Sequence, residues 1–98
     1  MNISIPKTDI QEFCRRNQIR RLSFFGSVLR DDFTAQSDVD VLVEFEPEAR
    51  IGLITLSGME IELTQILGRR VEIHTPRGLH PLFREEVLET AEVTYEQA

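Results

Sequence analysis

Two short motifs contain the residue types most suited to chemistry. Asp38 and Asp40 open one apolar run, and Gly26-Ser27 directly follows another, residues 22–25. Side chains two residues apart share one face of a strand, so the two carboxylates are expected roughly 7 Å apart along the backbone. Like charges this close repel unless a cation lies between them, and Mg²⁺ prefers oxygen ligands. The pair therefore predicts a magnesium site.

The Gly-Ser motif has the features of a phosphate-binding turn. Gly26 has no Cβ and lets the backbone approach a phosphate closely. Ser27 adds a hydroxyl donor, the N–H groups after it can bind an anion, and Arg30 can make a forked phosphate contact. Either motif alone is a weak signal, but together they fit nucleotidyl transfer, which depends on positioning and charge neutralisation.

Composition limits the classes of protein that fit. The 98 residues are 41% hydrophobic, which predicts one folded domain over residues 1–98. The formal net charge of −6 does not favour direct, sequence-independent binding to nucleic acid. Neither a membrane-spanning run nor a signal-peptide segment is apparent, and the single cysteine, Cys14, excludes an intramolecular disulfide. We therefore expect a cytoplasmic protein without membrane contact.

Hydrophobic periodicity predicts the element order α-β-β-α-β-α. The helices are expected over residues 9–17, 53–67 and 81–90, with Thr8 or Asp9 as the first N-cap and Gly68 as a C-cap. The strands are expected over residues 22–25, 39–45 and 70–75, with a further edge strand at 93–95. This predicts an α+β fold: a small mixed β-sheet with helices packed on one face, leaving the other face available.

Strand 39–45 alternates between two faces. One face is expected to carry Val39, Val41, Val43 and Phe45, and the other Asp38, Asp40, Leu42 and Glu44.

The stretch Leu22 to Phe45 resembles the minimal nucleotidyltransferase (MNT) family of the DNA polymerase β-type superfamily. The shared pattern is an apolar strand, Gly-Ser, ten residues, and Asp-x-Asp in a second apolar strand. The resemblance continues over residues 63–75, a leucine-rich helix followed by Gly-Arg and a short strand. It implies a polymerase β-like fold, ATP as substrate, triphosphate binding by Gly26 and Ser27, and two Mg²⁺ ions held by Asp38 and Asp40.

The third carboxylate of that family is usually an Asp in the later strand, and this sequence has Glu72 there. By the resemblance, Glu72 completes the catalytic and metal-binding set. Glu is one methylene longer and remains acidic, so it can still bind metal or act as a general base towards the acceptor.

The resemblance also implies a partner. Members of the family are usually encoded beside a HEPN-type toxin, and as antitoxins they transfer AMP from ATP to a tyrosine hydroxyl of that ribonuclease. The same role is expected here. One alternative, motivated by Glu72, is a catalytically weak antitoxin that neutralises its partner by binding alone. Another is a small-molecule nucleotidyltransferase, which would need a separate acceptor-binding subunit.

Sequence leaves the roles of three further residues open. His74 shares a predicted strand face with Glu72, and is either near the nucleotide or a structural side chain. Arg69 and Arg70 either complement a helix dipole or contact phosphate.

Overall fold

The computed structural model describes residues 1–97 and contains three α-helices, four strands and two short 3-10 helices. In chain order they are α1 Lys7–Arg16, β1 Ile19–Phe25, η1 Gly26–Leu29, β2 Val39–Phe45, α2 Leu53–Leu67, β3 Val71–His74, η2 Pro76–Gly78, α3 Pro81–Thr90 and β4 Glu92–Glu96. The bounds predicted for β2, α2 and α3 are confirmed. The final edge strand is also present, and β1 begins three residues earlier than predicted.

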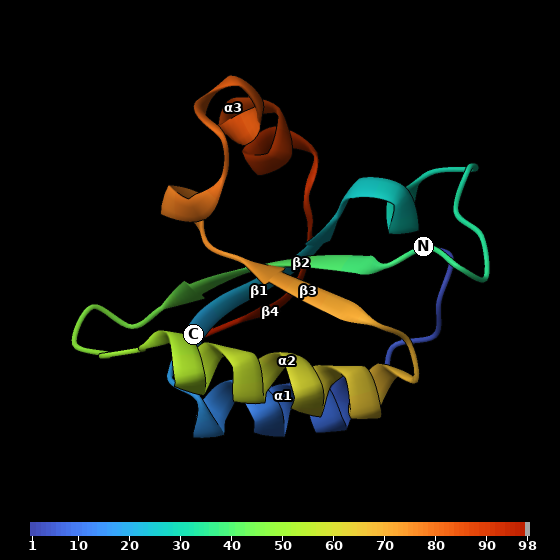
Figure 1. The fold of residues 1–98 in the computed structure, drawn as a ribbon. Coiled ribbons are helices and arrows are strands. Elements are labelled where there is room, and N and C mark those ends of the chain that lie inside the picture. The colour runs from blue at the N-terminus through green and yellow to red at the C-terminus, as the bar shows by residue number, and fades with distance from the viewer. Residues whose placement is uncertain (98) are drawn as a thin grey trace.

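The strands form one mixed sheet in the order β3-β2-β1-β4. β1 runs antiparallel to both of its neighbours, whereas β2 and β3 are parallel. The parallel pair needs a crossover, and α2 supplies it on one side of the sheet (Figure 1). This confirms the α+β fold class.

The main core lies between the sheet and the pair of helices α1 and α2 (Figure 1). The predicted alternation in β2 is confirmed, because Val39, Val41 and Val43 are fully buried there. Met59 and Leu63 complete this core from the predicted apolar face of α2.

The third helix does not join this layer. In Figure 1, α3 lies on the opposite side of the sheet from α1 and α2. A second small cluster forms there, in which Val87 and Ala91 pack against Phe25, Leu42 and Leu79. Two of the three helices thus cover one face as expected, and the third covers part of the face expected to be open. The physical reason is the apolar pair Phe25 and Leu42, which would otherwise be exposed.

The predicted N-cap of α1 is wrong, and the predicted C-cap of α2 is confirmed. Neither Thr8 nor Asp9 caps α1: Pro6 is the N-cap, and its carbonyl accepts the Ile10 N–H at 3.0 Å. Gly68 ends α2 as predicted, in the left-handed conformation, with its N–H 2.9 Å from the Thr64 carbonyl. Across residues 1–97, the structure contains no helix of sufficient length and apolarity to span a bilayer.

Candidate active site

Strand register brings residues distant in sequence into one row across the sheet. Phe25 in β1 pairs with Asp40 in β2, and Asp40 pairs with Glu72 in β3. Gly26 follows Phe25 and therefore lies directly beside this row. The carboxylates of Asp40 and Glu72 are neighbours because β2 and β3 are parallel and paired in this register.

Asp40, Glu72 and His74 form a compact cluster. One ligand atom from each lies within 4.8 Å of the others. Nε2 of His74 is 3.2 Å from Oδ1 of Asp40 and 3.8 Å from Oε2 of Glu72. The side chain of Asp40 is 25% exposed and that of Glu72 is 52% exposed, so both are open to solvent and to a ligand.

His74 is the charge partner of these carboxylates. Its hydrogen bond to Asp40 raises the pKa of the imidazole above its ordinary value, partial burial acts in the opposite direction, and the charges of Asp40, Glu72 and Glu60 raise it further. The ring also packs edge-on against Phe25, with centroids 5.2 Å apart. His74 therefore lies within the carboxylate cluster, in contact with Asp40.

Gly26 makes the closest approach of backbone to the cluster. Its φ is +78°, and a Cβ at this position would lie 2.9 Å from Oδ2 of Asp40. Only glycine meets both conditions without strain or displacement of the carboxylate. The absence of a Cβ on Gly26 thus leaves room for the Asp40 carboxylate to pack against the turn.

The 3-10 helix η1 carries Ser27 and leads to Arg30. The Arg30 N–H donates to the Ser27 carbonyl at 2.9 Å. Asn2 holds the outer side of this turn, because its backbone N–H and its side-chain amide both donate to the Val28 carbonyl, at 3.1 and 2.8 Å. Arg30 itself is exposed and lies 3.1 Å from a carboxylate oxygen of Asp32, an interaction weak enough for a phosphate to replace.

Asp38 lies beside the cluster rather than within it. Its carboxylate is 39% exposed and 4.0 Å from Nε of Arg70. The loop before it is held by Arg69, whose guanidinium donates to the carbonyls of Thr34 and Ser37 at 2.7 and 2.9 Å. Arg69 therefore positions the loop before Asp38, and Arg70 places a positive charge beside the Asp38 carboxylate.

The residues present fit a hard divalent cation. Asp40 and Glu72 offer converging carboxylate oxygens, and Asp38 directly precedes β2, beside Arg70. Gly26 also borders a hollow with room for phosphate oxygens, which commonly complete the shell of Mg²⁺. A site made only of protein ligands would need more donors than this, so the geometry favours metal arriving with a nucleotide.

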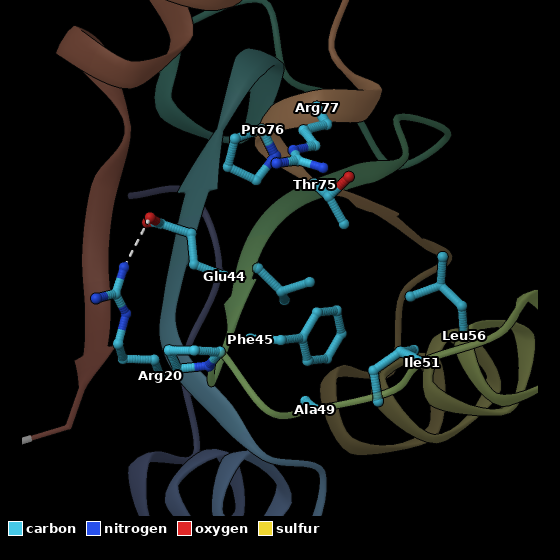
Figure 2. Close-up of a pocket in the computed structure, with 11 residues that line it drawn as sticks. Arg20, Glu44, Phe45, Ala49, Ile51, Leu56, Thr75, Pro76 and Arg77 are labelled. Carbon is cyan, nitrogen blue, oxygen red and sulfur yellow. Dashed lines mark ion pairs between the residues drawn. The ribbon is translucent and has the colours of Figure 1, made fainter.

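A separate hollow of about 700 Å³ borders η2 and lies away from the carboxylate cluster (Figure 2). Phe45, Ile51 and Leu56 form its apolar part, and Thr75, Pro76 and Arg77 its upper rim. Arg20 and Glu44 form an ion pair at 3.6 Å on one side. It contains neither Gly26 nor any of the cluster residues, so it is not where the carboxylates would act.

An α+β sheet that brings carboxylates together beside a glycine turn is suited to enzymes that transfer phosphate-containing groups with the help of a metal ion. The family model of the nucleotidyltransferase domain matches residues 8–93, and the chain belongs to this family. A protein of Methanocaldococcus jannaschii named "Putative protein adenylyltransferase MJ0435" is 35% identical over 92 residues, covering 93% of this chain and 96% of its own.

Solved structures share the fold. One described as a "putative minimal nucleotidyltransferase" is 36% identical, with a TM-score of 0.71 over 87% of this chain and 85% of its own. Two toxin–antitoxin structures are more distant in sequence. One, with AMP-PNP, has a TM-score of 0.75 at 17% identity, covering 95% and 75% of the two chains. The other, a tri-AMPylated Shewanella oneidensis HEPN toxin with its MNT antitoxin, has 0.67 at 16% identity, covering 93% and 70%.

The structure brings together most, but not all, of the predicted site. Gly26, Asp40 and Glu72 converge, Ser27 and Arg30 lie on the adjoining turn, and Asp38 is directed towards Arg70. Sequence reasoning did not assign His74 to the site. Its alternation with Glu72 was a usable signal, but only the pairing of β3 with β2 shows that the ring reaches Asp40.

Proposed function

We propose that this chain transfers AMP from ATP to a hydroxyl group of a partner protein, the tyrosine of a HEPN-type toxin, and so acts as its antitoxin. The observation that carries the proposal is the convergence of Gly26, Asp40 and Glu72, in which the Asp40 carboxylate packs against the glycine turn and beside Glu72. A phosphate-binding turn and a carboxylate pair at one point are what this transfer requires.

In the proposed reaction, the acceptor hydroxyl oxygen attacks the α-phosphorus of ATP. The bond from that phosphorus to the bridging oxygen breaks, and pyrophosphate leaves. Gly26, Ser27 and Arg30 bind the leaving phosphates, and the exposed carboxylate of Glu72 takes the hydroxyl proton. Asp38, Asp40 and Glu72 would hold two Mg²⁺ ions, which would neutralise charge on the phosphate oxygens.

The relatives support the acceptor class. The Methanocaldococcus jannaschii relative bears the name of a protein adenylyltransferase and is matched over nearly its full length. The HEPN partner is carried over from the toxin–antitoxin complexes that share the fold. We further propose that residues 1–98 act as one nucleotidyltransferase domain in the cytoplasm, where the buried free thiol of Cys14 stays reduced.

The test uses ATP labelled on its α-phosphate, Mg²⁺, and a HEPN-type protein from the organism that encodes this chain. We expect label on the HEPN protein with the wild type, and at least a roughly hundredfold loss with Asp40→Asn. Glu48→Gln is the matched control, since it removes an exposed carboxylate in the turn after β2. Replacement of the acceptor tyrosine by Phe should abolish labelling. Equal labelling by Asp40→Asn would contradict the mechanism.

A binding-only antitoxin remains the second candidate. Glu72 replaces the usual Asp, and Asp38 faces Arg70 rather than the cluster, so the metal-binding set is less complete than the resemblance implies. If this candidate is correct, the Asp38→Asn/Asp40→Asn variant will bind and neutralise the HEPN protein as well as the wild type does. Loss of neutralisation with binding intact would exclude it.

A further inference from the structure

A second hollow, about 450 Å³, joins the glycine turn to α3. Gly26, Arg30 and His74 form one wall, and Phe83, Glu86 and Thr90 of α3 form the opposite wall. The volume is within the range of small-ligand sites. One end of this hollow therefore contains the groups expected to bind phosphate, and the other contains an aromatic ring and a carboxylate.

The α3 wall is fixed in position relative to the glycine turn. Arg84 donates to the carbonyls of Pro76 and Leu79, at 2.8 and 3.2 Å, and so ties the first turn of α3 to η2. His80 caps the helix, its Nδ1 accepting the Leu82 N–H at 3.2 Å. Together with the packing of Val87 against the sheet, these contacts hold the two walls at a constant separation.

Phe83 presents an aromatic ring to this hollow. The residue is 58% exposed although it is large and apolar, and its ring is tilted against His80 with centroids 5.7 Å apart. An exposed ring on the wall of a hollow large enough for a small ligand is suited to stacking with a nucleobase, because every base has a flat π-face.

Glu86 lies three residues after Phe83, on the same side of α3, and also lines the hollow. A carboxylate is unfavourable beside phosphates, so a nucleotide should lie with its phosphates at Gly26 and Arg30 and its base at Glu86. An ionised carboxylate can only accept hydrogen bonds. It therefore matches the exocyclic amino group of adenine.

We propose that Phe83 stacks on the base of the bound nucleotide and that Glu86 accepts a hydrogen bond from the adenine amino group. This inference rests on the proposed function, because it assumes that a nucleoside triphosphate binds at Gly26. It adds two residues, both on a helix outside the Gly-Ser and Asp-x-Asp motifs.

The experiment measures three dissociation constants by calorimetry with Mg²⁺ present: those of ATP, of the analogue purine riboside triphosphate, which lacks the amino group, and of inorganic tripolyphosphate. For Phe83→Leu we expect ATP binding to weaken about tenfold and tripolyphosphate binding to stay within about twofold, since tripolyphosphate has no base to stack. For Glu86→Gln we expect the preference for ATP over the analogue to fall about fivefold, because a neutral amide oxygen accepts a weaker hydrogen bond from the amino group than a carboxylate does.

Leu88→Ala is the matched control, because Leu88 is an exposed apolar residue of α3 outside the lining of the hollow. It should leave all three constants unchanged. The proposal is overturned if Phe83→Leu weakens tripolyphosphate as much as ATP, if it weakens neither, or if Glu86→Gln leaves the ATP preference intact. Failure of the proposed function would look different: the wild type would bind neither ATP nor tripolyphosphate, or Asp40→Asn would retain transfer.

Discussion

At the scale of single residues, the site depends on the absence of a side chain as much as on the side chains present. Gly26 turns the chain through a positive φ and leaves room for the Asp40 carboxylate, while His74 balances the charge of that carboxylate. Both features act on Asp40, which makes it the central residue of the cluster. Changes at Gly26 should therefore affect chemistry more than folding.

Gly26→Ala tests this point. The left-handed backbone should cost about 1–2 kcal/mol of unfolding free energy, and the new Cβ should displace the Asp40 carboxylate. We expect AMP transfer to fall at least roughly tenfold while the domain still unfolds cooperatively in a thermal melt. In the described structure, a Cβ on Gly58, inside α2, would meet nothing within 4 Å, so Gly58→Ala should leave AMP transfer unchanged and should not lower stability. Full activity of Gly26→Ala would show that the close approach has no role.

Cys14 gives a pH dependence. The residue is fully buried, and burial raises the pKa of its thiol from 9.0 to about 12. Below pH 9 the thiol is protonated in both the folded and the unfolded chain. Between pH 9 and 12 the unfolded chain loses this proton and the folded chain keeps it, so the free energy of unfolding should fall by about 1.4 kcal/mol per pH unit.

Guanidinium unfolding at pH 8 and pH 10 measures this fall in stability. Cys14→Ala serves as the reference, because it lacks the thiol but retains every other titrating group. The wild type should lose more stability than the variant over this interval. It should also react with a thiol reagent at pH 8 only after unfolding. Equal pH dependence of the two proteins would contradict the buried, protonated thiol.

At the scale of elements, the edge strand β3 positions Glu72 and His74, and α2 secures it. The Val71 N–H donates to Oγ1 of Thr64 at 3.1 Å, and the Ile73 N–H donates to Oε2 of Glu60 at 2.7 Å. Side chains of the crossover helix thus satisfy backbone donors that a further strand would otherwise pair with. The crossover helix both connects β3 to β2 and closes its outer edge.

Thr64→Val should destabilise the protein, because it removes the acceptor while keeping the side-chain shape. A half-buried N–H left without a partner costs about 1–3 kcal/mol. We expect the melting temperature to fall by at least about 4 °C. Thr55→Val is the control, since Thr55 is exposed in the first turn of the same helix. Equal melting temperatures for the two variants would mean that water replaces the hydroxyl of Thr64.

At the scale of the whole molecule, the two sides of the sheet have different tasks. α1 and α2 bury the main core on one side, while the other side holds the carboxylates, η1 and α3 around the hollow of about 450 Å³. Acidic groups gathered on that side repel one another until a cation and a nucleotide neutralise them. Ligand binding and stability should therefore be coupled.

Mg²⁺ with ATP should raise the melting temperature. A ligand at a hundred times its dissociation constant stabilises the folded state by about 2.7 kcal/mol, which corresponds to roughly 10 °C or more in a domain of this size. Scanning calorimetry with and without EDTA measures the shift. Asp40→Asn should lose most of it and Glu48→Gln should retain it. A wild-type melting temperature unaffected by saturating ligand would argue against a formed nucleotide site.

Sequence by itself determined the elements and the motifs. Alternation in residues 39–45 and helical spacing in residues 53–67 are local patterns, and they predicted β2 and α2 to the residue. The Gly-Ser and Asp-x-Asp motifs were also readable, because their residue types and spacing lie within one short stretch of chain.

Only the tertiary structure decided which side chains meet. Asp40 contacts His74 through the parallel pairing of β2 and β3, and Phe83 faces Gly26 through the packing of α3 on Phe25 and Leu42. The two pairs, Asp40 with His74 and Gly26 with Phe83, are 34 and 57 positions apart in the sequence. Local periodicity fixes the face on which a residue lies, but strand register and helix placement follow from burying apolar surface across the whole molecule, which no local pattern encodes.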